Sequence, residues 1–159
     1  TLVTIQIDQM LAEKFGMEYV DKDGQKKNPY IIHRTSIGCY ERTLALLIEK
    51  YAGAFPTWLS PVQVKFLPVA DRHQDYCREV MSKLQAAGVR CELDDRSEKT
   101  GFKIRSAQME KVPYMIIVGD KDIEANTISV RSRKNGDEGA TSVDEFLSRI
   151  VTEIATKAR

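Results

Sequence analysis

The spacing of apolar side chains predicts a short series of strands and helices in the first third of the chain. Polar and apolar residues alternate over residues 4–8, and residues 30–35 have the composition of a second strand. Over residues 41–51, apolar side chains recur every three or four positions, which is typical of an amphipathic helix. Residues 55–61 then hold two prolines in seven residues. We therefore expect a domain boundary there, with one domain over residues 1–60 and a second over residues 61–159.

Beyond the two prolines, the apolar period switches repeatedly between strand and helix spacing. Strands are predicted over residues 62–66, 89–93, 114–118 and 127–131, and helices over 76–84, 102–111 and 143–154. Ser142 and Glu145 stand at the start of the last helix in the arrangement of a capping box. The order β-α-β-α-β-β-α predicts an α/β fold with a mixed sheet flanked by helices. The first 60 residues hold too few elements to bury a core alone, so we expect them to belong to a larger domain or to pack on the second one.

Composition indicates a folded, soluble chain but does not indicate which kind of molecule it binds. Of the 159 residues, 42% are hydrophobic and 30% are charged, and the net charge is +1. A nucleic-acid partner would therefore have to be inferred from local clusters of charge. The three cysteines form no Cys-x-x-Cys pair, which favours reduced thiols in the cytoplasm. The sequence shows neither a signal peptide nor the roughly 20 apolar residues of a membrane span.

His33 is the first candidate for chemistry. It shares a strand face with Ile31 and Thr35, so it is either a hydrogen-bonded, half-buried histidine or a zinc ligand, because imidazole suits zinc. No second ligand lies at a local spacing. The other histidine, His73, opens a predicted helix, where we expect it to be solvated.

A second candidate lies at the junction before the helix of residues 41–51. The N–H groups at a helix start can face a phosphate, and Arg42 could add a planar guanidinium. The plainer alternative is that Arg42 pairs with Glu41 or Glu49 on the surface. Cys39 has no visible acid–base partner, which argues against a nucleophilic role.

The basic residues of the second half gather within residues 96–111 and 131–134. On the predicted strand of residues 127–131, Ser129 and Arg131 face away from Ile128 and Val130. Such a strand could meet bases splayed out of a single-stranded RNA loop. A solvated charged face is the alternative, and the same element order also occurs in domains that bind small molecules.

Several blocks of the sequence together resemble one family, the threonyl-tRNA synthetases of class II. Near the start they are Thr4–Asp8, Pro29–Arg34 and Gly38–Arg42, followed by the junction Ala54–Gln63; downstream they are Asp95–Arg105, Pro113–Lys121 and Ser129–Arg131. The match is collinear over essentially the whole chain. The resemblance implies the end of an antiparallel class II catalytic domain followed by the class II anticodon-binding fold.

The resemblance also implies roles for particular residues. It implies that His33 is one ligand of a Zn²⁺ ion whose other ligands lie upstream. It also implies that the catalytic residue Arg42 contacts ATP, which is bound together with Mg²⁺ as the substrate. Gln6 and Cys39 would lie at the substrate pocket. The residues implied to contact anticodon bases are Ser97, Arg105, Asp122 and Arg131.

The parent enzyme implied by the resemblance activates threonine with ATP and transfers it to tRNA(Thr), as a cytoplasmic homodimer formed through the catalytic domain. The present chain lacks the first two class II motifs, so we expect it to be inactive alone. Among the positions that depart from the common pattern, Cys39 stands for Ser, Ser97 for Asn and Asp122 for Glu. One alternative is a non-catalytic anticodon-domain paralogue that serves as an RNA-binding accessory module, although such a relative need not keep His33 and Arg42. Another is a small-molecule-binding α/β domain with no RNA role.

Overall fold

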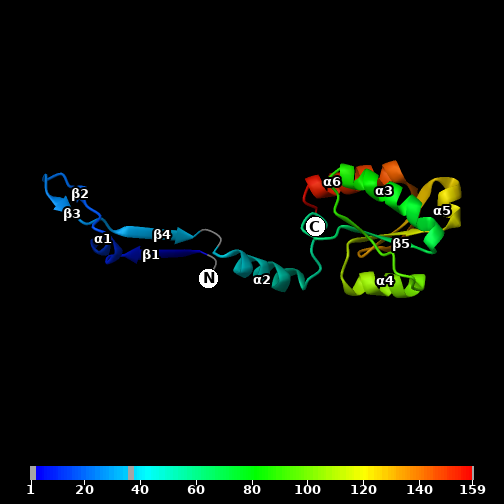
Figure 1. Ribbon diagram of the computed structural model, residues 1–159, viewed down its shortest axis with the longest axis horizontal. Coiled ribbons are helices and arrows are strands. Elements are labelled where there is room, and N and C mark those ends of the chain that lie inside the picture. The colour runs from blue at the N-terminus through cyan, green and yellow to red at the C-terminus, as the bar shows by residue number, and fades with distance from the viewer. Residues whose placement is uncertain (1–2, 36–37, 159) are drawn as a thin grey trace. The chain divides into compact units, whose positions relative to one another are not determined.

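The computed structural model describes residues 3–35 and 38–158 (Figure 1), and the chain divides into two compact units, Thr1–Lys50 and Tyr51–Arg159. In chain order the elements are β1 (Thr4–Asp8), α1 (Leu11–Lys14), β2 (Tyr19–Val20), β3 (Lys26–Lys27), β4 (Ile31–Thr35), α2 (Tyr40–Tyr51), β5 (Val64–Pro68), the 3-10 helix η1 (Asp71–His73), α3 (Gln74–Ala86), β6 (Cys91–Leu93), α4 (Thr100–Met109), β7 (Tyr114–Val118), α5 (Asp120–Ala125), β8 (Thr127–Ser132), β9 (Gly136–Ser142) and α6 (Val143–Ala155). Within the described residues, no helix is both long and apolar enough to span a membrane.

The first unit is built around the antiparallel pair of β1 and β4, in which Gln6 lies opposite His33 and Ile7 opposite Ile32. The Asp8 carboxylate ends β1 by accepting hydrogen bonds from the N–H groups of Met10 and Leu11, each at 2.8 Å, and so starts α1. Among the described residues of this unit, Ala12 alone is buried. The apolar side chains of the β1–β4 pair are mostly exposed, as expected for a segment with too few elements to bury a core.

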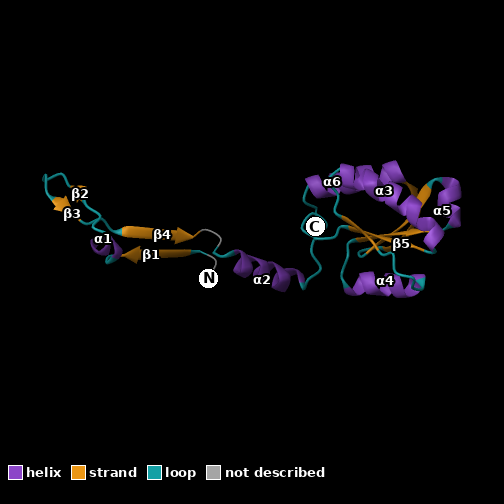
Figure 2. Ribbon diagram, in the orientation of Figure 1, coloured by secondary structure: helices purple, strands orange, loops and turns teal. Residues whose placement is uncertain are grey.

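The second unit is a five-stranded mixed sheet in the order β6-β5-β7-β8-β9. Strands β6, β5 and β7 are parallel, whereas β8 and β9 are each antiparallel to their neighbours. Helices α3 and α6 cover one face of the sheet and α4 covers the other (Figure 2). The predicted α/β fold with a mixed sheet flanked by helices is confirmed.

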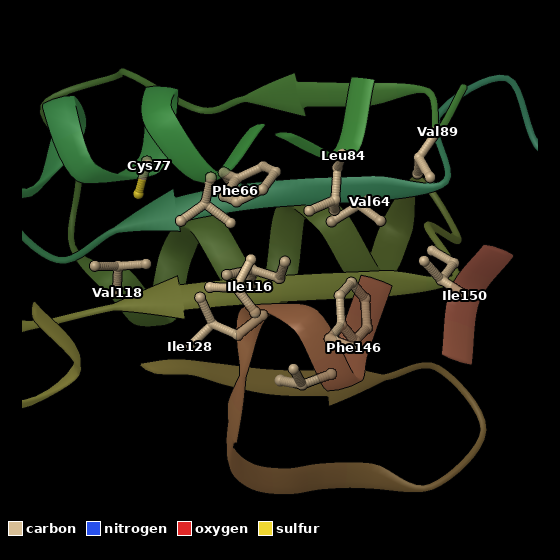
Figure 3. Packing of buried hydrophobic residues seen from close by; sticks show 13 residues of the cluster. Val64, Phe66, Cys77, Leu84, Val89, Ile116, Val118, Ile128, Phe146 and Ile150 are labelled. Atoms are coloured by element: carbon tan, nitrogen blue, oxygen red, sulfur yellow. The ribbon is translucent and has the colours of Figure 1, made fainter. Parts of the chain in front are cut away.

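Two apolar clusters hold these layers together, one on each face of the sheet. The larger cluster joins the sheet to α3 and α6, and most of its members are 0–2% exposed (Figure 3): Val64, Phe66, Cys77, Val80, Leu84, Val89, Ile116, Val118, Ile128, Val130, Val143, Phe146 and Ile150. The smaller one joins the sheet to α4 and includes Leu67, Ala107, Val112 and Met115. Because both faces of β5 are covered, all five of its residues are buried.

Helix α5 and strand β9 of the second unit were not predicted from the sequence. Helix α5 has six residues, which is too short to show a helical period. Strand β9 (GDEGATS) has no apolar alternation, because it is an edge strand that is held by its ladder to β8. At the start of α6, the predicted cap is present, since Ser142 Oγ accepts a hydrogen bond from the Glu145 N–H at 3.2 Å.

The expectation that His73 is solvated is wrong. Its side chain is 1% exposed, and Nδ1 accepts a hydrogen bond from the Ala70 N–H at 3.0 Å. Nε2 lies 2.9 Å from an oxygen of Asp120, which follows β7. The ring therefore connects the loop after β5 to the start of α5. Its contact with Asp120 joins residues 47 positions apart, which no local sequence pattern predicts.

The segment before β5 is hydrogen-bonded to the rest of the second unit. Arg90 donates to the carbonyls of Trp58 and Ser60 at 2.8–3.0 Å, and Arg133 donates to the Phe55 carbonyl at 2.7 Å. Thr57 Oγ1 donates to Glu153 on α6 at 2.5 Å. Along the chain, the first compact unit ends at Lys50 and the second begins at Tyr51. A functional boundary between residues 60 and 61 stays a prediction.

Candidate functional site

The first candidate site lies on the polar face of the β1–β4 pair. Because side chains alternate along a strand, Gln6 and Asp8 share this face with His33 and Thr35, and these four residues line an open hollow together with Ile7. Asp8 is already engaged at the start of α1, and the hydrogen bonds from the Leu11 and Met10 N–H groups lower its pKa. The groups left to meet a ligand are an amide, a hydroxyl and one imidazole.

This donor set fits one ligand of a zinc site. The His33 side chain is exposed on its strand, so its ring nitrogens can be reached. No group of three His, Cys, Asp or Glu side chains with the spacing of a metal site occurs among the described residues. Because a protein zinc site takes three or four protein ligands, His33 would need partners from outside these residues.

Cys39 and Arg42 lie at the start of α2, and both are exposed. The Cys39 carbonyl accepts a hydrogen bond from the Thr43 N–H at 3.2 Å, so Cys39 belongs to the helix start. Gly38 precedes them with φ +79°, a left-handed conformation that favours glycine. This geometry agrees with the predicted strand-to-helix junction and leaves the Arg42 side chain on the surface of α2.

A second candidate site lies on the α4-facing side of β8. Ser129 pairs with Ile117 and Arg131 with Met115, and both of those β7 residues belong to the cluster packed against α4. Ser129 and Arg131 are only half-buried, because α4 packs over the β5 and β7 part of this face. As predicted, they face away from the buried Ile128 and Val130, which belong to the larger cluster on the other face of the sheet.

Arg131 stands out on this face for two reasons. The ladder between β8 and β9 shifts register between Val130 and Arg131, and such a bulge re-aims the side chain beside it. In addition, Arg131 Nε is buried and has no hydrogen-bond partner among the described residues. A buried donor without an acceptor costs about 1–3 kcal/mol, so a movement of the side chain that brings Nε to a ligand's acceptor would be favourable.

Asp122 is next to this face but is turned into the domain. It is 9% exposed, and it lies in the first turn of α5. One carboxylate oxygen accepts a hydrogen bond from the Gly119 N–H at 2.9 Å, and the other accepts from the Ser129 hydroxyl at 2.7 Å. The structure thus joins Asp122 to the β8 face through Ser129, a residue that sequence reasoning placed on this face without giving it a role.

Ser97 lies at a different place, in a hollow at the carboxyl ends of β5 and β6. It is exposed and lines this hollow with Val69, Arg96, Lys99 and Lys103, among others. Lys103 is 4% exposed, and its ammonium donates to the carbonyls of Pro68 and Asp94 at 3.1 and 3.2 Å. Sequence reasoning counted Lys103 among the basic surface residues, but it closes the ends of two strands.

Arg96, which lines this hollow, is hydrogen-bonded to the carboxylate of Asp94. The guanidinium donates to both oxygens of the buried Asp94, and this hydrogen bonding is the main reason why the pKa of Asp94 is lowered. Arg105 is exposed on α4. Asp122 is hydrogen-bonded to Ser129, which shares the outer face of β8 with Arg131.

Comparison with known proteins accounts for both units. A family model described as "Anticodon binding domain" matches residues 63–153. The chain belongs to the anticodon-binding domain family. A second model, "tRNA synthetase class II core domain (G, H, P, S and T)", matches residues 1–51, ahead of this anticodon-binding domain.

Individual relatives are similar over the whole chain. A threonine–tRNA ligase of Clostridium botulinum (strain Eklund 17B / Type B) is 62% identical over 159 residues, which is 100% of this chain and 25% of the relative. One of Caldanaerobacter subterraneus subsp. tengcongensis is 52% identical over 155 residues, 98% of this chain and 24% of the relative. The predicted resemblance to threonyl-tRNA synthetases is confirmed, and the chain spans about a quarter of the length of these curated relatives.

A solved structure agrees with the fold. The RNA-binding domain of threonyl-tRNA synthetase from Cryptosporidium parvum Iowa II is 28% identical, with a TM-score of 0.71 over 94% of this chain and 38% of that chain. The class II anticodon-binding fold expected for the second unit is therefore confirmed. In this anticodon-binding domain, the predicted RNA contacts reach solvent on the open face of β8, in the hollow beside Ser97 and, for Arg105, on α4.

Proposed function

We propose that this chain is the tRNA-reading part, and one side of the catalytic site, of an enzyme that activates threonine with ATP and transfers it to tRNA(Thr). The proposal is supported by relatives up to 62% identical that are named threonine–tRNA ligases. It is also supported by the order of the two family matches, the class II core before the anticodon-binding domain.

The observation that carries RNA reading by the second unit is the unpaired Nε of Arg131. A guanidinium can donate two parallel hydrogen bonds to the edge of a guanine or to a phosphate, which would satisfy this donor. Arg131 lies on a strand face that α4 leaves open, where an unstacked loop base could approach. Arg105 and Ser97 would contribute from α4 and from the loop after β6, and Asp122 from α5.

The first unit would supply part of the threonine and ATP site. His33 would provide one nitrogen to a Zn²⁺ ion, and Gln6 across the ladder would face the same hollow. When bound, such an ion offers an open coordination position to the amino and hydroxyl groups of threonine. Arg42 and Cys39 at the start of α2 would lie beside ATP and its Mg²⁺, Arg42 stabilising phosphate charge.

The parent enzyme would contain further segments, including the other zinc ligands and the surface that forms a homodimer. A cytoplasmic location and the inactivity of this chain alone belong to the same proposal. Because a hydroxyl-bearing substrate satisfies a polar site that its isostere leaves unpaired, selection of threonine over valine would depend on the zinc side of the site.

Binding of RNA tests the part of the proposal that this chain can carry out by itself. Fluorescence anisotropy with labelled tRNA(Thr), and with the same tRNA carrying a substituted anticodon, should show tighter binding of the unsubstituted RNA. A loss of about 1–3 kcal/mol for each disrupted base contact is expected. Equal affinity for both RNAs at moderate salt would contradict anticodon reading, because only the sequence-independent phosphate contacts would then remain.

The zinc assignment needs a longer protein that includes the upstream segment. His33→Ala in that protein should lower the zinc content measured by elemental analysis, whereas Gln6→Ala should not. Full zinc occupancy in the His33→Ala protein would contradict the assignment.

A further inference from the structure

Both carboxylate oxygens of Asp122 are hydrogen-bonded within its own domain. One accepts from the Gly119 N–H at 2.9 Å and the other from the Ser129 hydroxyl at 2.7 Å, and the residue is 9% exposed. A carboxylate accepts hydrogen bonds and does not donate them, so the direction of the second bond is set: Ser129 must be the donor. The single hydroxyl hydrogen of Ser129 is therefore directed toward Asp122.

This arrangement decides what Ser129 can offer to a ligand. A serine hydroxyl has one hydrogen and two lone pairs, and with the hydrogen engaged only the lone pairs are left. Ser129 is half-buried on the open face of β8, two residues before Arg131, which carries donors alone. The face thus presents a hydrogen-bond acceptor and a donor at neighbouring positions.

We propose that Ser129 is a specificity-determining residue that accepts a hydrogen bond from an exocyclic amino group of an RNA base, and that Asp122 is the positioning residue that sets its polarity. This inference rests on the proposed anticodon-reading function and adds to it the kind of base edge that is selected. A free serine hydroxyl can rotate and pair with either a donor or an acceptor, so it discriminates poorly between the amino and keto groups of bases. A hydroxyl held by a carboxylate accepts only, and it would reject a keto oxygen at the same position.

A single substitution of nearly equal shape can reverse the direction of the hydrogen bond between Ser129 and residue 122. In Asp122→Asn, the Gly119 N–H still needs an acceptor, which keeps the amide oxygen on that side. The amide NH₂ then faces Ser129 and donates to its oxygen. The Ser129 hydrogen turns outward, and the residue becomes a donor toward RNA.

The experiment measures the affinity of the 159-residue chain for anticodon stem-loops of tRNA(Thr). At each anticodon position in turn, cytosine is compared with uracil and adenine with hypoxanthine, in which a keto oxygen replaces the amino group. Guanine is also compared with hypoxanthine, in which the amino group is lost. At one position the unsubstituted chain should favour the amino-bearing base by about fivefold or more. Ser129→Thr should keep this preference, Ser129→Ala should nearly abolish it, and Asp122→Asn should shift it toward the keto base.

A matched control separates the reversed hydrogen bond of Asp122→Asn from the loss of a negative charge in that variant. Asp144→Asn removes the same charge from the exposed first turn of α6 and should leave every base preference unchanged. Thermal unfolding measurements check that each variant is folded. If Asp122→Asn is unfolded, the base preference of Ser129→Ala tests the inference instead. An amino-over-keto ratio that is the same with and without Asp122→Asn or Ser129→Ala, while the chain still distinguishes anticodons, overturns this inference alone. Indifference of the unsubstituted chain to the anticodon overturns the inference and the proposed function together.

Discussion

Replacing Arg131 by methionine should make the free chain more stable and make it a poorer RNA binder. Methionine keeps much of the aliphatic stem of arginine but removes the buried Nε donor that has no partner. Burying an unpaired donor costs about 1–3 kcal/mol, and part of that cost is offset because the rest of the half-buried guanidinium can reach water. The free energy of unfolding should therefore rise by about 1 kcal/mol.

The same substitution should weaken binding to tRNA(Thr). If Arg131 makes a paired contact to a base, its loss costs about 1–3 kcal/mol, which corresponds to about 5–150-fold in the dissociation constant. Urea unfolding followed by circular dichroism measures the first effect, and fluorescence anisotropy at fixed salt measures the second. The two effects have opposite sign because the free chain leaves unsatisfied a group that the bound RNA satisfies.

Arg133→Met is the matched control, two residues further along the chain and with the same change in charge. The Arg133 guanidinium does have partners, since it donates to the carbonyls of Lys111 and Phe55 at 2.5 and 2.7 Å. Its loss should lower the free energy of unfolding by about 1–3 kcal/mol and weaken RNA binding without regard to the anticodon sequence. A stability that falls in Arg131→Met as it does in Arg133→Met would refute the reasoning, because Arg131 would then have partners in the free chain.

Two further predictions concern titratable groups. Burial raises the pKa of the Cys77 and Cys91 thiols to about 12, so at about pH 8 a thiol reagent should modify the exposed Cys39 rapidly and the other two only after unfolding; rapid modification of a second thiol in the folded chain would contradict this. Hydrogen bonding from Arg72 holds the pKa of Asp120 well below its usual range, so the stability it contributes is present above the unfolded pKa of about 3.9 and is lost as the pH falls through the lowered value. Arg72→Met should raise the pKa of Asp120 seen in carboxyl-carbon NMR titrations, and an unchanged titration would count against the pairing.

The strongly patterned elements could be read from the sequence alone. The uninterrupted apolar run predicts the central strand over residues 114–118, and β7 is Tyr114–Val118. The helical spacing and the Ser142 cap predict α6, which begins at Val143. These elements are predictable because burial on one or both faces leaves a period in the sequence, and this period also led to the mixed sheet and to the outward face of β8.

The contacts that give the candidate site its chemistry were decided by the tertiary structure. Residue types and family resemblance pointed to Arg131 and Asp122, but not to the absence of a partner for Nε or to the hydrogen bond from Ser129. The burial of His73 likewise depends on a remote neighbour, and β9 shows no apolar period because it is an edge strand held by its ladder to β8. The physical reason is that apolar burial is summed over many residues and leaves a repeating pattern, whereas a hydrogen bond joins two particular atoms that only folding brings within 3 Å of each other.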